Sequence, residues 1–321
     1  MRHALFAMAA AVAAAPAHAQ PQAFPAPVVT MVVPTSAGTS SDIVARALST
    51  RLSGKWNNSV VVDNKTGASG SIGIGYAGKA APDGNTILIV TNTISMLGAI
   101  NKNLPWTPGD FAPVALMGRT VTALVVNADL PVSNVKELVA LAQSKPGQIN
   151  YATPGVGTPH HLYTELFKLI TKTDIAHVPY KATAGATVDI AGGRAQVGFF
   201  PLNSVMSLVN AKKIKILATA GDERTPQAPD APTFKEAGIA DVHASSWIGI
   251  FVPKNTPQAV VDRLDRDIRS VMADKTFQEE LQRQEVAPNT KLGGPAELGS
   301  LLASDIARWK DVVEKAGITE Q

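Results

Sequence analysis

Short apolar runs alternate with amphipathic segments along the first part of the chain. The apolar runs have the length and composition of buried strands and cover residues 28–33, 60–62, 87–90 and 114–117. Between them, residues 41–52 and 73–80 read as helices, the first with apolar residues recurring at helical spacing. Strands that alternate with helices are typical of an α/β unit, so we expect a largely parallel sheet here.

A second series of the same kind begins at residue 122. Its expected strands are 122–127, 149–152, 175–178, 195–200, 214–219 and 246–253. Its expected helices are 135–143, 184–191, a long helix from Pro257 through Met272, and a final amphipathic helix that contains Trp309 and Val312. Because 321 residues also favour two domains on length alone, we predict two α/β units.

Two segments, residues 33–42 and 151–161, share one design. Each passes from an apolar run through a glycine-containing turn into a predicted helix. The first backbone N–H groups of a helix have no partner within it and attract anions. Either segment alone is also compatible with an ordinary strand-to-helix turn. Their similarity in separate units favours a common role, which is to clamp a carboxylate.

Residue types locate the start of both helices. Thr39 and Asp42 have the spacing of a capping box. Thr158 suits the N-cap position, and Pro159 suits the first helical position because its missing N–H would have no partner there.

The N-terminus is typical of a secretory signal peptide. Arg2 and His3 precede an Ala-rich apolar stretch that ends in an A-x-A site at residues 17–19. We therefore expect residues 1–19 to be removed near Ala19, and the mature chain to begin near Gln20 and to be exported. No later stretch of the sequence is long and apolar enough to predict a transmembrane helix.

Composition narrows the chemistry. The chain has no cysteine, which excludes disulfides, thiolate metal sites and a cysteine nucleophile. The net charge of +3 is small, and its densest basic group, residues 212–215, lies between an apolar helix and an apolar strand. Such a group indicates a solvated turn rather than a nucleic-acid surface.

Cofactor and catalytic motifs are matched poorly. Residues 73–78 fit G-x-G-x-x-G, but no acidic residue follows between residues 84 and 109, and Ala80 stands where a P-loop needs Ser or Thr. No G-x-S-x-G motif occurs. His160, His161, His177 and His243 lack metal-ligand spacing, so we expect neither a metal nor a cofactor. His160 is either a hydrogen-bond donor beside the second turn or an exposed first-turn residue.

Taken in order, several segments resemble the solute-binding proteins of tripartite tricarboxylate transporters, the Bug family. They are residues 34–42 with Ala45 and Arg46, 64–73, 80–84, 151–162, 177–181, 229–233 with 236–238, and the strand that ends at Pro253. Each segment is a weak signal alone, but their order is specific, and the resemblance covers essentially the whole mature chain.

The resemblance implies an α/β fold of two lobes, a type II periplasmic binding protein with a mixed sheet flanked by helices in each lobe. Residues 20–122 and 250–321 would form one lobe and residues 123–249 the other, hinged by the crossing strands 122–127 and 246–252. It further implies a periplasmic monomer that binds a small organic carboxylate, serves integral membrane transporter subunits, and is neither an enzyme nor a nucleic-acid binder.

In such proteins one ligand carboxylate is held by the first loop and by residues 155–158, largely through backbone groups and bridging water. The predicted ligand-binding residues here are Thr35, Ser36, Ala37, Gly38, Thr39, Ser40, Asp42, Ala68, Ser69, Thr153, Gly155, Val156, Gly157, Thr158, His160, Thr183 and Asn203. Thr183 and Asn203 would contact the far end of the ligand. Asp189 is interpreted as structural, because an acid facing an anionic ligand would repel it.

This sequence departs from the family pattern in its first loop. Thr35 and Ser36 replace an aromatic residue, and Thr39 replaces a second glycine; His160 and Ala182 also differ from the usual Asn and Gly. The loss of a bulky side chain should enlarge or polarise the cleft. Our hypothesis is that the ligand is a larger acid, such as the aromatic dicarboxylate terephthalate.

Two other classes of function are compatible with an exported chain. A secreted hydrolase of small carboxylic esters would need a nucleophile and a base that the sequence does not bring together. A structural or adhesive module would bind no small molecule. A thermal-shift screen with organic acids separates both from a binding protein.

Overall fold

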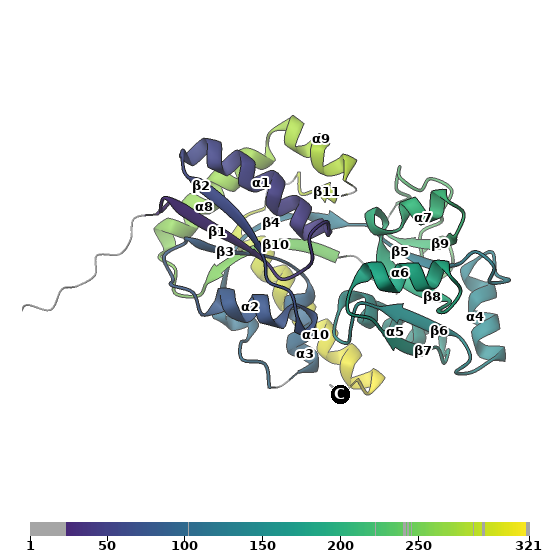
Figure 1. The fold of residues 1–321 in the computed structure, drawn as a ribbon. Helices are drawn as coiled ribbons and strands as arrows, with labels where there is room; N and C mark the ends of the chain where they lie inside the picture. Colours follow the sequence, from purple (N-terminus) through teal and green to yellow (C-terminus); the bar gives the residue numbers. More distant parts are fainter. Residues whose placement is uncertain are drawn as a thin grey trace, which may run out of the picture.

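The computed structural model describes residues 24–318 except 102, 222, 240, 241, 243, 245, 285, 291 and 292. The predicted signal peptide and His243 lie outside the described residues. The chain forms two α/β lobes, each built around one sheet (Figure 1).

The sheet of the first lobe has the strand order β11-β4-β10-β3-β1-β2. Its strands are β1 (Val28–Val33), β2 (Ser59–Asn64), β3 (Thr86–Thr91), β4 (Phe111–Thr120), β10 (Ser246–Pro253) and β11 (Val286–Pro288). β1 is parallel to β2 and β3, whereas β10 is antiparallel to β3 and β4, and β11 to β4. The sheet is therefore mixed, and the expectation of a largely parallel sheet is wrong here because β10 re-enters from the other lobe.

Helices cover both faces of this sheet. One face packs on α1 (Ser40–Trp56), α8 (Gln258–Met272) and α9 (Lys275–Arg283), and the other on α2 (Ser71–Gly78), α3 (Thr93–Ile100) and α10 (Pro295–Ala316). Along β1, Met31 and Val33 face the first core while Val32 faces the second. Because successive side chains point to opposite faces, a strand buried on both sides reads as a continuous apolar run.

The second lobe repeats this plan with the strand order β7-β6-β8-β5-β9. Its strands are β5 (Thr122–Asn127), β6 (Asn150–Thr153), β7 (Ala176–Pro179), β8 (Val197–Pro201) and β9 (Ile214–Ala220). Its helices are α4 (Val135–Ser144), α5 (Pro159–Thr171), α6 (Thr183–Ala191) and α7 (Met206–Asn210). β6 is parallel to β7 and β8, while β5 is antiparallel to β8 and β9. This sheet is mixed as well.

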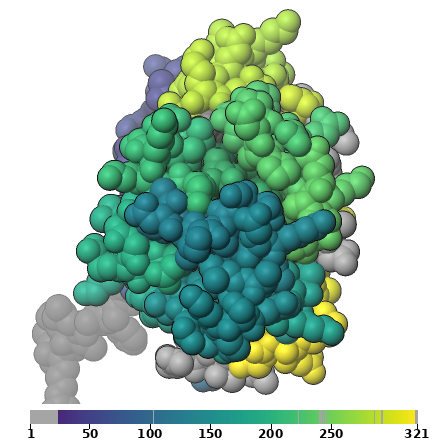
Figure 2. Space-filling model, turned by 90° about the vertical axis from the view of Figure 1, so that its right-hand side faces the viewer, coloured from purple at the N-terminus to yellow at the C-terminus, as the bar shows by residue number. Residues whose placement is uncertain are grey.

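The chain crosses between the sheets at Val121, between β4 and β5, and returns between β9 and β10. α10 connects the lobes a third time, because Leu298 and Leu302 pack in the first lobe while Trp309 and Val312 pack in the core of the second. Figure 2 shows the second lobe in teal and green with the yellow C-terminal segment at its lower edge. The lobe limits near residues 122 and 249 remain predictions.

The strands and helices expected from the pattern all form, with ends that differ by a few residues. The pattern indicates neither α3, α9 nor β11, and it places an apolar helix before residues 212–215, where α7 lies, without giving its bounds. The short helices η1 (Ala68–Gly70), η2 (Pro108–Asp110) and η3 (Leu202–Ser204) complete the described elements. None of the described helices combines the length and apolar composition needed to cross a bilayer.

Candidate functional site

A cavity of about 750 Å³ lies between the lobes. Its wall combines residues 34–41, the segment around η1, the ends of β3, β4 and β5, the turn after β6, and the starts of α5 and α6. The predicted site residues that line it are Thr35, Ser36, Ala37, Gly38, Thr39, Ser40, Ala68, Ser69, Gly155, Thr158, His160, Thr183 and Asn203. The predicted residues Asp42, Thr153, Val156 and Gly157 are not part of its lining.

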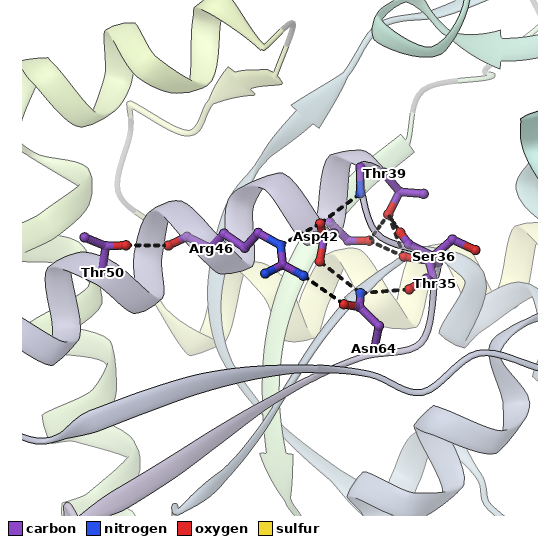
Figure 3. Close-up of polar contacts among 9 residues, drawn as sticks. Thr35, Ser36, Thr39, Asp42, Arg46, Thr50 and Asn64 are labelled. Carbon is purple, nitrogen blue, oxygen red and sulfur yellow. Dashed lines mark hydrogen bonds and ion pairs between the residues drawn. The ribbon is translucent and has the colours of Figure 1, made fainter.

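A buried carboxylate anchors the first loop, residues 34–39, to α1 (Figure 3). Asp42 is 2% exposed and accepts hydrogen bonds from the Gly38 N–H, from Arg46 Nε and from Asn64 Nδ2, each at 2.9 Å. Burial raises the pKa of Asp42, but the hydrogen bonds from Arg46, Gly38 and Asn64 outweigh it and leave the pKa below its ordinary value. Asp42 therefore stays ionised and holds the loop in place.

Hydroxyl groups bond to one another within the first loop. Thr35 Oγ1 lies 2.7 Å from Thr39 Oγ1 and 2.9 Å from Ser41 Oγ, and the Thr39 hydroxyl also donates to the Ser36 carbonyl at 2.9 Å. Thr39 is the N-cap residue of α1, but its side chain does not cap the helix. The predicted capping box is wrong, because the Thr39 hydroxyl is bonded within the loop and Asp42 accepts from another loop residue.

The second loop, residues 154–158, depends on glycine. Gly155 and Gly157 have φ of 134° and 79°, in the region that favours glycine. A Cβ on Gly155 would lie 2.9 Å from Ser69 Oγ, and one on Gly157 would lie 2.7 Å from Leu97 Cδ2. Thr158 occupies the predicted N-cap position of α5, but its side chain does not cap the helix, and its hydroxyl donates instead to the Gly155 carbonyl at 2.7 Å. The close approach of the first lobe thus requires these glycines.

Two histidines, His161 and His177, form hydrogen bonds with the second loop and with the end of the strand before it. The Gly157 N–H donates to His161 Nδ1 at 3.4 Å, and Thr153 Oγ1 lies 2.7 Å from His177 Nε2. The two imidazole centroids are 4.5 Å apart. Burial lowers the pKa of both histidines to about 4, so both rings are neutral near pH 7. Thr153 therefore supports the second loop through its contact with His177 and is not part of the cavity surface.

Hydrogen bonds join the lobes around the cavity. Ser69 Oγ donates to the Val156 carbonyl at 2.8 Å, and Asn203 Nδ2 donates to Ser40 Oγ at 3.1 Å. In the buried interior, Asn92 Nδ2 donates to the Tyr163 hydroxyl at 2.8 Å. These contacts bring the N-terminal turns of α1 and α5 to one cavity from opposite lobes.

At the cavity, both helices have backbone N–H groups that form no hydrogen bond within their own helix. In α1 the first internal hydrogen bond is donated by Ile43 to the Thr39 carbonyl, and in α5 by Leu162 to the Thr158 carbonyl. The N–H groups of the preceding helical residues have no carbonyl acceptor within their own helix. α6 begins at the same cavity with Thr183.

The charge of the lining suits an anion. Among the described residues, the lining contains no Asp or Glu, and Lys181 is its basic residue. His160 lines the cavity 5.1 Å from the Phe200 ring, and burial lowers its pKa to about 4. Asp189 lies outside the lining and accepts from the Tyr180 hydroxyl at 2.7 Å while it pairs with Arg194.

Several cavity residues were not predicted from the sequence. One of them is Lys181. Most of the others bear hydroxyl groups: Ser41, Thr66, Thr91, Thr93, Thr120, Thr122, Tyr163, Tyr180, Thr187, Ser204 and Ser246. A usable signal was present at three of them, because Thr91 and Thr120 are polar residues that end apolar strands and Thr122 is a polar residue that begins one.

Two kinds of side-chain arrangement, metal-ligand groups and hydroxyl–histidine pairs, are not found among the described residues of the cavity lining. No group of three or more His, Asp or Glu residues with a metal-binding arrangement occurs among them. Within the described part of the chain, no lining Ser or Thr hydroxyl is hydrogen-bonded to a histidine, and the pair Thr153 and His177 lies outside the lining.

Comparison with known proteins agrees with this architecture. The family model described as "Tripartite tricarboxylate transporter family receptor" matches residues 44–318. A UPF0065 protein from the tcbD-tcbE intergenic region of Pseudomonas sp. strain P51 is 33% identical over 91% of this chain and 87% of its own length. Protein BugT of Bordetella pertussis is 30% identical over 92% of this chain and 90% of its own length.

Solved structures show the same periplasmic binding protein fold. Rpa4515 of R. palustris, solved with adipate, is 32% identical, with a TM-score of 0.85 over 92% of this chain and 99% of its own. MatC of Rhodopseudomonas palustris, solved with bound malate, is 27% identical, with a TM-score of 0.83 over 90% of this chain and 100% of its own.

Proposed function

This chain belongs to the tripartite tricarboxylate transporter receptor family, and we propose that it is a periplasmic solute-binding protein for an organic di- or tricarboxylate. It would capture the acid in the cavity between its lobes and deliver it, as a monomer, to integral membrane transporter subunits. The observation that carries the proposal is the convergence of the N-terminal turns of α1 and α5 on a cavity whose described lining has no acidic residue.

The physical basis is the partial positive charge of helix N-termini. Each such terminus stabilises a nearby anion by about 0.3–1 kcal/mol when exposed, and by up to ~2 kcal/mol when partly buried. Two termini from opposite lobes can share one carboxylate, so the anion favours the arrangement in which the lobes are in contact. Release by opening then separates the two sets of donors.

Two relatives support a carboxylate as ligand, since one was solved with adipate and the other with malate. The cavity of about 750 Å³ falls within the range of roughly 300–1,000 Å³ that is usual for small-molecule sites. It has room for an aromatic ring, and Thr35 and Ser36 stand where an aromatic side chain would reduce that room. An aromatic dicarboxylate such as terephthalate is therefore our specific proposal for the ligand.

A thermal-shift and calorimetric screen tests the proposal. The mature protein would be titrated with acetate, malate, adipate, citrate, benzoate and terephthalate, and with terephthalamide as an uncharged control. We expect one site per chain, and a stabilisation of about 2.7 kcal/mol at a hundredfold excess of ligand over its dissociation constant.

The outcomes separate the parts of the proposal. Binding of aliphatic diacids without terephthalate would refute the aromatic ligand and keep the carboxylate receptor. Equal binding of terephthalamide would contradict recognition of a negative charge. No shift with any organic acid would overturn the proposed function and favour a structural module, whereas turnover of simple esters would favour the hydrolase.

A further inference from the structure

Six buried side-chain polar atoms have no hydrogen-bond partner among the described residues: Asn85 Nδ2, Thr120 Oγ1, Thr122 Oγ1, His160 Nδ1, Asp265 Oδ1 and Trp309 Nε1. Three of them, on Thr120, Thr122 and His160, belong to residues that line the one cavity described above. Thr120 and Thr122 are 3% and 2% exposed. Unpartnered buried hydroxyls are thus concentrated at the proposed ligand site.

These two threonines lie where the chain passes from one lobe to the other. Thr120 ends β4 and Thr122 begins β5, on either side of Val121. Thr120 pairs across the sheet with Ser246, and Thr122 pairs with Pro201, and both partners also line the cavity. The threonines therefore belong to the hinge side of the cavity.

The neighbouring polar groups are already satisfied, which sets the threonines apart. Ser246 Oγ donates to Asn92 Oδ1 at 2.9 Å, and Asn92 Nδ2 donates to the Tyr163 hydroxyl at 2.8 Å. A buried hydroxyl without a partner is costly, and a valine of the same shape would avoid that cost. Two such hydroxyls, on lining residues two positions apart in the chain, indicate donors that a ligand would satisfy.

The surroundings suit a negatively charged acceptor. α3 begins at Thr93, which lines the cavity, and its N-terminal turn adds partial positive charge on the same side. Thr91 Oγ1 and Thr93 Oγ1 are 2.8 Å apart and both residues line the wall. Among the described lining residues there is no carboxylate to compete for these donors.

We propose that Thr120 and Thr122 form a hinge-side subsite that donates hydrogen bonds to the second carboxylate of a diacid. This rests on the proposed function, in which the first carboxylate lies between α1 and α5. The ligand then spans the cavity from the helix clamp to the hinge, and the hinge threonines select diacids over monoacids of the same length.

Substitution by valine tests this with little change of shape. Thr120→Val, Thr122→Val and the double variant would be titrated with two matched pairs of acids, adipate with hexanoate and terephthalate with 4-methylbenzoate. We expect each single variant to weaken diacid binding about tenfold, because a hydrogen bond to a charged group is lost, and to leave monoacid binding within about twofold. The preference for the diacid should therefore shrink.

Stability without ligand gives a second, independent measurement. Because the hydroxyls have no partner, the melting temperature of the free Thr120→Val and Thr122→Val proteins should stay unchanged or rise. Thr173→Val is the matched control, since its buried hydroxyl bonds to Thr171 Oγ1 at 2.9 Å and it lies outside the cavity lining. That variant should lose stability and keep its affinity.

Each result counts for or against the subsite. If the unaltered protein binds a diacid and the valine variants bind it equally well, the subsite is wrong while the proposed function stands. A fall in the melting temperature of the free variants with unchanged affinity would assign the hydroxyls to folding and also overturn it. If the unaltered protein binds none of the organic acids of the thermal-shift screen, the proposed function fails and the subsite fails with it.

Discussion

The first and second loops present the same backbone donors but are held by opposite chemistry. The first loop is held by an ionised carboxylate, Asp42, whose pKa lies below its ordinary value although burial acts to raise it. The second loop is supported by two imidazoles, His161 and His177, whose pKa values burial lowers to about 4. Two loops of similar sequence should therefore respond differently to mutation and to pH.

Burial is the main reason why both histidines stay neutral, and the nearby charged groups modify its effect. The Glu165 carboxylate accepts hydrogen bonds from the Tyr151 hydroxyl at 2.5 Å and from Lys168 Nζ at 2.7 Å, so it already has two hydrogen-bond donors other than the histidines. Lys168 lowers the pKa of both histidines further, while Glu165 acts in the opposite direction on His177. Protonation of His161 would remove the acceptor that its Nδ1 offers to the Gly157 N–H, because both nitrogens of an imidazolium are donors.

The largest effect should come from the carboxylate of the first loop. Asp42→Asn replaces a charged acceptor of three hydrogen bonds with an amide that cannot serve all three donors, and we expect a loss of about 3 kcal/mol in the free energy of unfolding. Urea denaturation measures it. Asp311→Asn is the matched control, because it also breaks an i,i+4 ion pair, with Lys315 at 2.8 Å, but at 60% exposure.

The control should cost less than about 0.5 kcal/mol, as is usual for exposed pairs. Equal losses from the two substitutions would show that burial of Asp42 does not matter, and the contrast between the loops would fail.

The second prediction concerns pH. His161 has a folded pKa of about 4, below its ordinary 6.5, so the unfolded chain binds more protons between these values and stability falls as pH falls through this window. One pKa unit corresponds to about 1.4 kcal/mol, so the contribution of His161 should be about 2 kcal/mol between pH 6.5 and roughly 4.5.

His161→Asn keeps an acceptor for the Gly157 N–H but cannot be protonated. Its unfolding free energy should depend less steeply on pH, by about one proton, than that of the unaltered protein. As the pH is lowered, hydrogen exchange corrected for intrinsic rates should show that residues 154–158 lose protection at a higher pH than residues 34–39 do. Simultaneous loosening, or identical slopes for both proteins, would contradict the assignment.

The third prediction compares glycines of the two loops. Gly38 and Gly157 have similar φ, 82° and 79°, but a Cβ on Gly38 meets nothing within 4 Å while one on Gly157 meets Leu97 Cδ2 at 2.7 Å. Gly38→Ala should cost about 1 kcal/mol from backbone strain alone. Gly157→Ala should cost about 1 kcal/mol more through the clash, and denaturation of both variants would reveal the difference.

The smallest effect should come from the loss of a single hydrogen bond between the two lobes. Ser69→Ala removes the hydrogen bond to the Val156 carbonyl, which is worth about 1 kcal/mol of closure and a three- to sixfold loss of ligand affinity. Ser144→Ala removes a bond of the same 2.8 Å length within α4 and should leave affinity unchanged. Unchanged affinity in both variants would mean that this contact does not favour closure.

α3 is a helix that could not be predicted from the sequence. Its sequence, residues 93–100, is apolar on almost every side because Ile94 and Leu97 pack in one core while Met96 and Ile100 pack in another. A helix buried between two lobes has no polar face, so helical periodicity is not visible in it. Most sheet strands were predictable for the converse reason, since each contains an apolar run bounded by polar residues, whereas β11 is only three residues long.

The sequence by itself determined most of the elements, the two glycine turns and their position at helix starts, because these depend on residues close together along the chain. Only the tertiary structure decided which polar groups are paired. Asp42 in α1 accepts a hydrogen bond from Asn64 in β2, and Ser69 donates one to the Val156 carbonyl in the other lobe. The hydroxyls of Thr120 and Thr122 have no partner among the described residues. Pairing and burial depend on which distant segments pack around a group, and local pattern carries no record of that.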